Sequence, residues 1–217
     1  TSMSHVVCIA GESGTGKTTS MRKLAPETTL YIDCDKKGLS WKGWKADFNG
    51  ANKNYLVTDF PQVALNALRK VNEQENMKHI KVVVVDTING LMVADEMRRA
   101  KEKGYDKWQD LAQSIYDLID YSLTMRDDVT IVFVAHTQTD HDENGYMFTR
   151  IKTSGRKLDK ITLESKFSTV LLSKCVDGRY VFETQANLST AKSPMGAFAD
   201  REIDNDITAV IEALQEF

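Results

Sequence analysis

The sequence predicts an α/β fold in which helices flank a mainly parallel central sheet. Apolar runs of strand length alternate with segments whose apolar residues recur at three- and four-residue spacing. One run, "IKVVVVD" at 80–86, contains four consecutive valines, as expected for a parallel strand covered on both faces. The 217 residues include only 3 prolines and no repeat or low-complexity linker, so residues 1–217 are expected to form a single domain.

The first half of the chain predicts four strands joined by helices. The expected strands are "HVVCIA" (5–10), "TLYIDCD" (29–35), "NYLVTD" (54–59) and "IKVVVVD" (80–86). A helix over 17–25 is expected after the first strand. A second helix over 60–75 is expected because its apolar residues fall on one face; these are Val63, Ala67, Leu68 and Val71.

The second half continues the alternation and adds an antiparallel pair of strands. Helices are expected over 90–102, 108–126 and 203–216, and a buried strand over 129–135. The runs 167–175 and 179–185 flank "VDGR", whose Asp-Gly pair favours a two-residue turn, so they are expected to form a C-terminal hairpin. The segments 36–53, 137–166 and 186–202 fit neither period, and long loops of this kind tend to be functional.

The net charge and the length of the apolar runs limit the kinds of function that the sequence allows. The net charge is −3, from 28 basic and 31 acidic residues, so the bulk charge does not indicate a nucleic-acid binder, although a local basic surface is compatible with it. The longest apolar runs are strand-length, which is far too short to span a membrane, and no signal peptide is recognisable. A cytoplasmic protein without a membrane partner is expected.

A phosphate-binding loop follows the first strand. Residues 11–18, "GESGTGKT", match G-x-x-x-x-G-K-[ST] between a predicted strand and a predicted helix. Glycines let backbone N–H groups surround phosphate oxygens, Lys17 reaches the β- and γ-phosphates, and the Thr18 hydroxyl binds Mg²⁺. ATP and Mg²⁺ are therefore the expected cofactors. The expected nucleotide-binding residues are Gly11, Glu12, Ser13, Gly14, Thr15, Gly16, Lys17, Thr18 and Thr19.

A second acidic motif ends the valine run. Asp86 stands at the carboxyl end of a predicted parallel strand, where it would hold Mg²⁺ through a water molecule; capping of the following helix is the alternative. The next residue is Thr87 rather than a glutamate that would activate water. The catalytic base is therefore expected elsewhere, and Asp33 and Asp35 are the candidates because alternation along the second strand places both on one face.

These motifs together resemble the RecA-like ATPases, which include recombinases, the DnaB-type helicase motor and KaiC-like proteins. The resemblance rests on the phosphate loop, "VVVVDT", the acidic residue after the second strand and "FVAHTQ". It implies a RecA-like P-loop NTPase fold, with Asp35 as the base. It also implies that Gln138 senses the γ-phosphate, with His136 as the alternative.

The segment "STAKSPMGAF" is similar to the A-K-x-R-x-G loop of DnaB-type motors. By that resemblance Lys192 reaches the γ-phosphate of a neighbouring copy, whereas Pro194 replaces the expected arginine. Over nearly its full length the chain resembles the single-domain RecA-like AAA-domain ATPases of bacteriophages, which act in single-strand annealing and recombination. The resemblance implies single-stranded DNA, further copies of the chain in a ring or filament, and a single-strand-binding protein as partners.

The segments 96–108 and 137–157 correspond to the DNA-binding loops of recombinase-like proteins. They combine cations for phosphates with aromatic side chains for base stacking: Tyr105 and Trp108 in the first, Tyr146 and Phe148 in the second. A solvated helix end and a loop without DNA contact are the alternatives. The expected DNA-binding cations are Arg98, Arg99, Lys101, Lys103, Arg150, Lys152, Arg156 and Lys157.

The leading functional hypothesis is a DNA-stimulated ATPase that binds single-stranded DNA. A nucleotide-gated DNA-binding or loading module with little turnover is an alternative, and a P-loop small-molecule kinase is another. Trp41 and Trp44, three residues apart in the 36–53 loop, are expected to pack under that loop, with adenine stacking or a subunit contact as alternatives.

Overall fold

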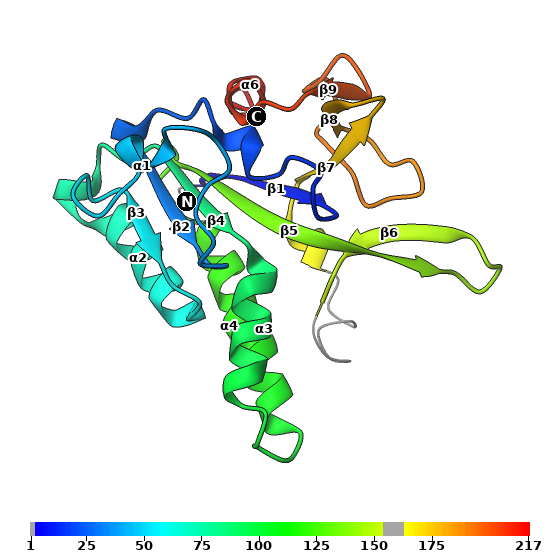
Figure 1. The fold of residues 1–217 in the computed structure, drawn as a ribbon, viewed down its shortest axis with the longest axis horizontal. Coiled ribbons are helices and arrows are strands. Elements are labelled where there is room, and N and C mark those ends of the chain that lie inside the picture. The colour runs from blue at the N-terminus through cyan, green and yellow to red at the C-terminus, as the bar shows by residue number, and fades with distance from the viewer. Residues whose placement is uncertain (1–2, 154–162) are drawn as a thin grey trace.

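The computed structural model describes residues 3–153 and 163–217, which form a mixed sheet covered by helices on both faces (Figure 1). In these residues the strand order is β3-β2-β4-β5-β1-β7-β8-β9, and β6 pairs with the far part of β5. The strands are β1 (His5–Gly11), β2 (Thr29–Asp33), β3 (Tyr55–Val57), β4 (Val82–Asp86), β5 (Thr130–His141), β6 (Met147–Ile151), β7 (Thr169–Val176), β8 (Arg179–Glu183) and β9 (Glu202–Asp204).

The sheet is parallel through its centre and antiparallel at its C-terminal end. Parallel pairing joins β3, β2, β4, β5, β1 and β7, whereas β8 and β9 pair antiparallel to their neighbours. The turn between β7 and β8 has Asp177 at φ 51° and Gly178 at φ 77°, as a type I′ turn requires. The predicted fold class and the predicted C-terminal hairpin are confirmed.

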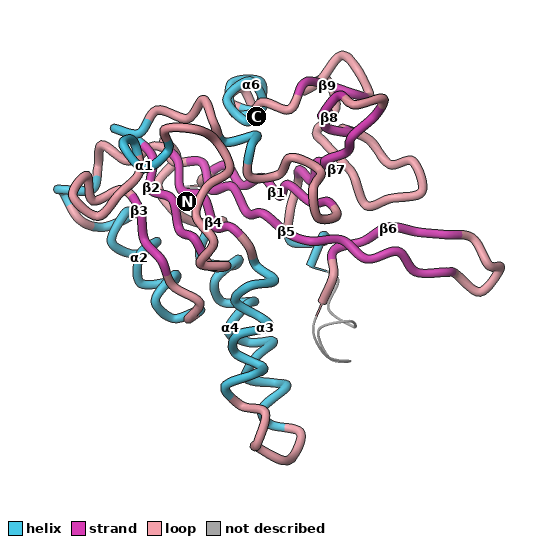
Figure 2. Tube along the Cα trace, in the orientation of Figure 1, coloured by secondary structure: helices cyan, strands magenta, loops and turns pink. Residues whose placement is uncertain are grey.

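The two faces of the sheet are covered by different numbers of helices; Figure 2 marks the helices and strands by colour. The α-helices of the described ranges are α1 (Trp44–Asp47), α2 (Pro61–Glu73), α3 (Ile88–Arg98), α4 (Asp106–Ser122) and α6 (Ile207–Leu214), and short 3-10 turns occupy Thr19–Met21, Pro26–Thr28, Glu75–Met77 and Leu163–Lys166. Residues of α2, α3 and α4 pack on one face, and α6 with the turn Thr19–Met21 packs on the other. None of these helices combines the length and the apolar character needed to cross a membrane.

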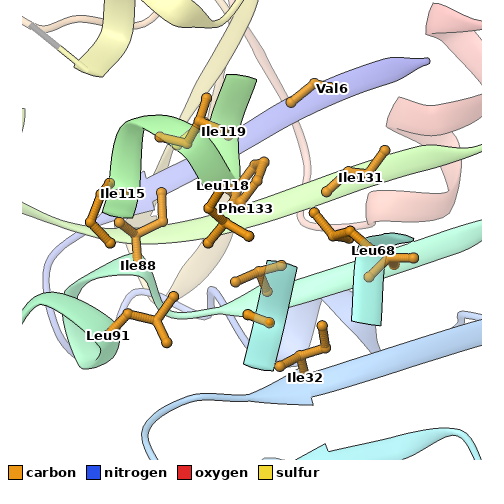
Figure 3. Close-up of a cluster of buried hydrophobic side chains, with 14 of the residues drawn as sticks. Val6, Ile32, Leu68, Ile88, Leu91, Ile115, Leu118, Ile119, Ile131 and Phe133 are labelled. Carbon is orange, nitrogen blue, oxygen red and sulfur yellow. The ribbon is translucent and has the colours of Figure 1, made fainter. Parts of the chain in front are cut away.

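The four valines of β4 show why its sequence does not alternate. Val83 and Val85 contribute to the core beneath α2, α3 and α4, and Val82 and Val84 contribute to the core on the opposite face. Figure 3 shows the first of these cores, where Leu68 of α2 lies among side chains of α3, α4 and β5. Burial on both faces holds the end of β4 firmly beside its neighbours.

The helix predicted over 17–25 is wrong, because only the 3-10 turn Thr19–Met21 forms there. Two features of the segment shorten it. Ala25 precedes Pro26 and is extended, at φ −68° and ψ 116°, since a following proline disfavours helical backbone. The Ser20 hydroxyl donates to the Lys17 carbonyl at 2.5 Å and so competes with helical hydrogen bonding.

The loop predicted over 137–166 is in large part a hairpin, in which β5 continues to His141 and pairs with β6. Its turn is closed by Asp142, whose side chain accepts from the backbone N–H groups of Asn144 at 2.9 Å and Tyr146 at 2.8 Å. Figure 1 shows this hairpin reaching out from the body of the sheet. Strand alternation is weak in the polar sequence "TQTDH", which explains why periodicity does not reveal it.

Candidate functional site

The carboxyl ends of β1, β2, β4 and β5 bring the predicted site residues to one edge of the sheet. Strand β5 lies between β1 and β4, so that Gly11 pairs with His136 while Asp86 pairs with Val134. On the other side of β4, Asp86 pairs with Asp33. Polar groups from four strands therefore meet where ligands bind in open α/β sheets.

The phosphate loop depends on glycine at three positions. Gly14 and Gly16 have φ values of 78° and 85°, which side chains rarely adopt. At Gly11, a β-carbon would lie 2.6 Å from Thr15 Oγ1 and 2.9 Å from the Ser173 carbonyl oxygen. The connection between β1 and the 3-10 turn Thr19–Met21 is thereby held in a tight loop whose backbone N–H groups can face an anion.

Lys17 is buried inside this loop. Its Nζ donates to the Glu12 carbonyl oxygen at 2.5 Å, and only 7% of the residue is exposed. Burial lowers the pKa of Lys17 to about 8, although the nearby Asp86 carboxylate opposes this change. A buried ammonium group in this position favours an anionic ligand, because the ligand would offset the cost of its burial.

A cavity of about 290 Å³ lies between the loop and the segment that follows β2. It brings together most of the predicted nucleotide-binding residues, Asp86 and a second lysine, Lys37. Sequence reasoning missed Lys37, because a lysine in a polar loop carries no signal of its own. The residues that line the cavity are Ser13, Gly14, Gly16, Lys17, Thr18, Thr19, Lys37, Gly38, Leu39, Ser40, Asp86 and His136.

The two oxygens of the Asp86 carboxylate differ in their hydrogen bonding. Oδ2 accepts from Thr18 Oγ1 at 2.8 Å and from the Tyr31 hydroxyl at 2.5 Å. Oδ1 is buried and accepts no hydrogen bond from the described residues. Burial raises the pKa of Asp86, and the two hydrogen bonds oppose that change.

These groups fit a divalent cation. A buried carboxylate oxygen without a partner, next to a threonine hydroxyl, offers the oxygen ligands that Mg²⁺ prefers. The capping alternative is resolved in favour of Thr87, whose hydroxyl accepts from the Gly90 N–H at 3.0 Å at the start of α3. Because Thr87 caps α3, Asp86 is not needed as the cap and its carboxylate is available to bind a cation.

The sequence predicted that Asp33 and Asp35 lie on one face of a strand. This prediction is wrong, because β2 ends at Asp33 and Asp35 lies beyond it. Asp33 is saturated: it accepts from the backbone N–H groups of Lys36 and Gly38, both at 2.9 Å, and from the Tyr55 hydroxyl at 2.5 Å. It stabilises the turn and has little capacity left for a substrate.

Asp35 has the environment of a base. It lines a second cavity of about 670 Å³ that adjoins the first, since Ser13 and His136 line both. Its Oδ1 accepts from the Thr87 hydroxyl at 3.1 Å, and its Oδ2 is buried without a partner among the described residues. Burial, followed by the charge of Asp86, raises the pKa of Asp35. Between the two candidates, the geometry favours Asp35.

Gly90 in α3 allows Asp35 its position. A β-carbon at residue 90 would overlap Asp35 Oδ1 and would lie 2.9 Å from the Cys34 carbonyl oxygen. Sequence reasoning missed Gly90, since a glycine inside a helical pattern carries no information about the neighbour it accommodates. Tyr31 was missed for a related reason, because alternation identifies it only as a strand residue.

Of the two sensor candidates, the structure brings His136 and not Gln138 to the phosphate cavity. His136 lines both cavities, and burial lowers the pKa of its imidazole to about 4, with the charges of three lysines acting in the same direction. Gln138 lies farther along β5, where its amide donates to Asp140 Oδ2 at 3.0 Å. The sensor role itself stays a prediction.

Asn89 ties this region together. The side-chain oxygen of Asn89 accepts from the backbone N–H of His136 at 2.7 Å, and its side-chain amide donates to the backbone carbonyl of Lys152 at 2.8 Å. The Lys152 N–H in turn donates to the His136 carbonyl at 2.7 Å. The base of the β5–β6 hairpin is thereby joined to the first turn of α3, two residues from Thr87.

Lys192 is not among the residues that line either cavity. Its backbone pairs with Val170 of β7, at 2.9 Å and 2.8 Å, on the side of β7 that faces away from β1. Its predicted action on a neighbouring copy stays a prediction.

The first predicted DNA segment has two of its cations in internal ion pairs. Arg98 pairs with Asp59 and Asp95 and lies 3.6 Å from the Phe60 ring centre. Arg99 pairs with Glu102 at 2.8 Å and Asp110 at 2.9 Å. These pairs hold the end of α3 against its neighbours and oppose the predicted phosphate role of both arginines. Lys101 and Lys103 are exposed in the turn before α4.

The second predicted DNA segment presents aromatic rings on the β5–β6 hairpin. Tyr146 and Phe148 are 66% and 40% exposed, whereas Arg150 pairs with Asp140 at 2.6 Å. Lys152 is exposed and lines the larger cavity. The predicted cations Arg156 and Lys157 lie outside the described residues.

The packing prediction for the two tryptophans is confirmed. Trp41 meets Phe48 edge-on, with ring centres 6.1 Å apart, and Trp44 meets Tyr55 at 5.3 Å. A β-carbon on Gly38 would lie 2.8 Å from the Trp44 ring, so the loop is folded closely over it.

Comparisons with known proteins identify a family for the chain. The family model described as "AAA domain" matches residues 3–195. A solved structure, flagellar accessory protein FlaH from Methanocaldococcus jannaschii, is 15% identical and aligns over 93% of this chain and 84% of that chain with a TM-score of 0.44. No curated protein matches the sequence.

His136 predicts a pH dependence of stability. Because its pKa is about 4 in the folded chain and near 6.5 when unfolded, the unfolded state binds more protons between these values. The contribution of His136 to the free energy of unfolding should therefore rise with pH from about 4 to about 6.5. In His136→Gln this contribution should disappear, which denaturant titrations at several pH values would measure.

The matched control is His79→Gln, at an exposed position between Glu75–Met77 and β4. It should keep the pH dependence of the parent chain. An unchanged pH dependence in His136→Gln would contradict the assignment of a buried, neutral imidazole beside the phosphate loop.

Proposed function

The chain belongs to the AAA domain family, and on that premise we propose that it is a Mg²⁺-dependent ATPase that binds single-stranded DNA. The proposed role is in recombination or annealing, as in the phage ATPases that the sequence resembles. The observation that carries the ATPase proposal is the buried Oδ1 of Asp86, which lies beside Lys17 and Thr18 and accepts no hydrogen bond from any residue that the structure describes.

Different residues in and beside the phosphate cavity would bind the phosphates, bind the metal and activate water during hydrolysis. Lys17 and the loop N–H groups would hold the β- and γ-phosphates, while Thr18 and Asp86 would hold Mg²⁺. Bound Mg²⁺ supplies positive charge that neutralises phosphate oxygens. Asp35, whose buried Oδ2 has no partner in the described part of the chain, would orient a water molecule and accept its proton.

DNA binding would use exposed groups of the β5–β6 hairpin and of the turn before α4. The rings of Tyr146 and Phe148 offer stacking surfaces on the hairpin, and Lys101 and Lys103 offer unburied positive charge. The Asn89 hydrogen bonds connect the base of that hairpin to α3, next to Asp35 and Thr87. This continuity supports a link between nucleotide state and DNA grip.

A second candidate is a small-molecule kinase, which the larger cavity favours. Its volume of about 670 Å³ is sufficient for an acceptor molecule, and Asp35 lines it. A nucleotide-gated DNA-binding or loading module with little turnover is the third candidate.

Steady-state ATP hydrolysis with and without single-stranded DNA separates these functions. Turnover should rise with DNA, and Lys17→Ala should reduce it by at least about 100-fold, because a positioned charge on the transferring phosphate is lost. Lys70→Ala, which removes an exposed lysine of α2, is the matched control and should hydrolyse ATP normally.

Each alternative has its own outcome in this assay. Phosphate transfer to a small acceptor in place of water would favour the kinase. Tight DNA binding without turnover would favour the module. Full turnover in Lys17→Ala would rule out hydrolysis in this cavity.

The hairpin rings predict a DNA-binding defect of a defined kind. Tyr146→Ala with Phe148→Ala should weaken single-stranded DNA binding by about 1–3 kcal/mol per stacked base and leave the salt dependence unchanged, since no charge is removed. Lys101→Ala with Lys103→Ala should instead reduce the salt dependence. Fluorescence anisotropy at several salt concentrations measures both.

Tyr116→Ala, at a partly exposed tyrosine of α4, controls for loss of an aromatic side chain. Normal DNA binding by both double variants would exclude these two surfaces as the DNA site.

A further inference from the structure

A third cavity lies beside the phosphate loop, on the side away from Asp35. It has a volume of about 470 Å³ and is lined by residues that follow the loop, by β8 and by the segment from β9 into α6. Thr19 lines both this cavity and the phosphate cavity, so the two adjoin. The larger cavity that contains Asp35 shares Ser13 and His136 with the phosphate cavity, and not Thr19.

The direction of a bound nucleotide follows from this arrangement and rests on the proposed function. The γ-phosphate end is fixed by the base and metal groups, Asp35 and Asp86, while the loop N–H groups hold the α- and β-phosphates. The nucleoside must then leave the loop at its other end, past Gly16 and Thr19. That is where the third cavity begins.

Tyr180 of β8 gives this cavity an aromatic wall. The ring touches the loop, since a β-carbon on Gly16 would lie 2.9 Å from its Cδ1, yet 45% of the residue is exposed. An exposed aromatic ring fixed against a phosphate loop is suited to stack on a base. Trp41 and Trp44 have their rings packed against Phe48 and Tyr55 instead.

The opposite wall is tied to the loop by hydrogen bonds. The buried Asn205 donates from Nδ2 to the Gly16 carbonyl at 3.1 Å. Arg22 donates to the Asn205 carbonyl at 2.6 Å and to the Thr19 carbonyl at 3.1 Å. The cavity wall and the phosphate loop are therefore linked directly, and such a link lowers the entropic cost of ordering a site for a ligand that occupies both.

Asp204 supplies an acceptor at the rim. It is exposed, it lines the cavity, and among the described residues its carboxylate makes no hydrogen bond. A free carboxylate beside a nucleotide commonly accepts from a ribose hydroxyl.

We propose that the cavity formed by Thr19, Arg22, Tyr180, Asp204 and Asn205 binds the nucleoside of ATP, with the base stacked on Tyr180 and the ribose hydroxyls facing Asp204. The C-terminal hairpin β7–β8 is thus part of the nucleotide site. Figure 1 shows β8, β9 and α6 in the upper part of the view, above β1.

The test compares ATP with inorganic tripolyphosphate, each with Mg²⁺, by isothermal titration calorimetry. Tripolyphosphate engages the phosphate loop and has no nucleoside. Tyr180→Ala should weaken ATP binding by about 5- to 150-fold, the value of one stacked base, and should leave tripolyphosphate binding unchanged. Tyr180→Phe keeps the ring and should bind ATP like the parent chain.

Tyr116→Ala removes an exposed tyrosine elsewhere, with a similar exposed fraction of 39%, and should bind both ligands normally. Unchanged ATP binding in Tyr180→Ala would overturn the nucleoside site and leave the proposed function standing. Equal weakening of ATP and tripolyphosphate would also overturn it, since Tyr180 would then act only by supporting Gly16. If the parent chain binds neither ligand, the proposed function fails as well.

Discussion

The unequal hydrogen bonding of the Asp86 carboxylate is the constraint on which the rest of the site depends. Thr18 and Tyr31 both donate to Oδ2, so the carboxylate cannot rotate freely, and within residues 3–153 and 163–217 the buried Oδ1 has no hydrogen-bond partner. A buried charge of this kind is costly unless an opposite charge accompanies it. Lys17 supplies part of that charge from the neighbouring loop, and a divalent cation would supply the rest.

Three strands have to be in register for this arrangement to exist. Tyr31 comes from β2, Asp86 from β4 and Thr18 from the loop after β1, and β5 separates β1 from β4. The valines of β4 are buried on both faces of the sheet, so the strand that carries Asp86 cannot shift without disturbing two cores. Packing energy is thereby used to hold one carboxylate oxygen in place.

Local sequence predicted the parts of this site that local chemistry determines. The phosphate loop needs glycine at strained positions, and the valine run needs cover on both faces, so each leaves a pattern in the sequence. The Asp177-Gly178 turn is equally local. What could not be predicted depends on partners distant in sequence: the Tyr31 hydroxyl bound to Asp86, the space that Gly90 leaves for Asp35, and the ion pair of Arg98 with Asp59. The helix predicted over 17–25 is the converse error. The pattern favours a helix there, but Pro26 disfavours helical backbone at Ala25, and only the turn Thr19–Met21 forms.

The most direct test of the account is the affinity for Mn²⁺, used in place of Mg²⁺ and measured by electron paramagnetic resonance in the presence of ATP. If Asp86 Oδ1 is held free for the metal, Asp86→Asn should weaken Mn²⁺ binding by at least about 10-fold, while ATP binding without metal should persist. Mn²⁺ binding of equal affinity in Asp86→Asn and the parent chain would contradict the account.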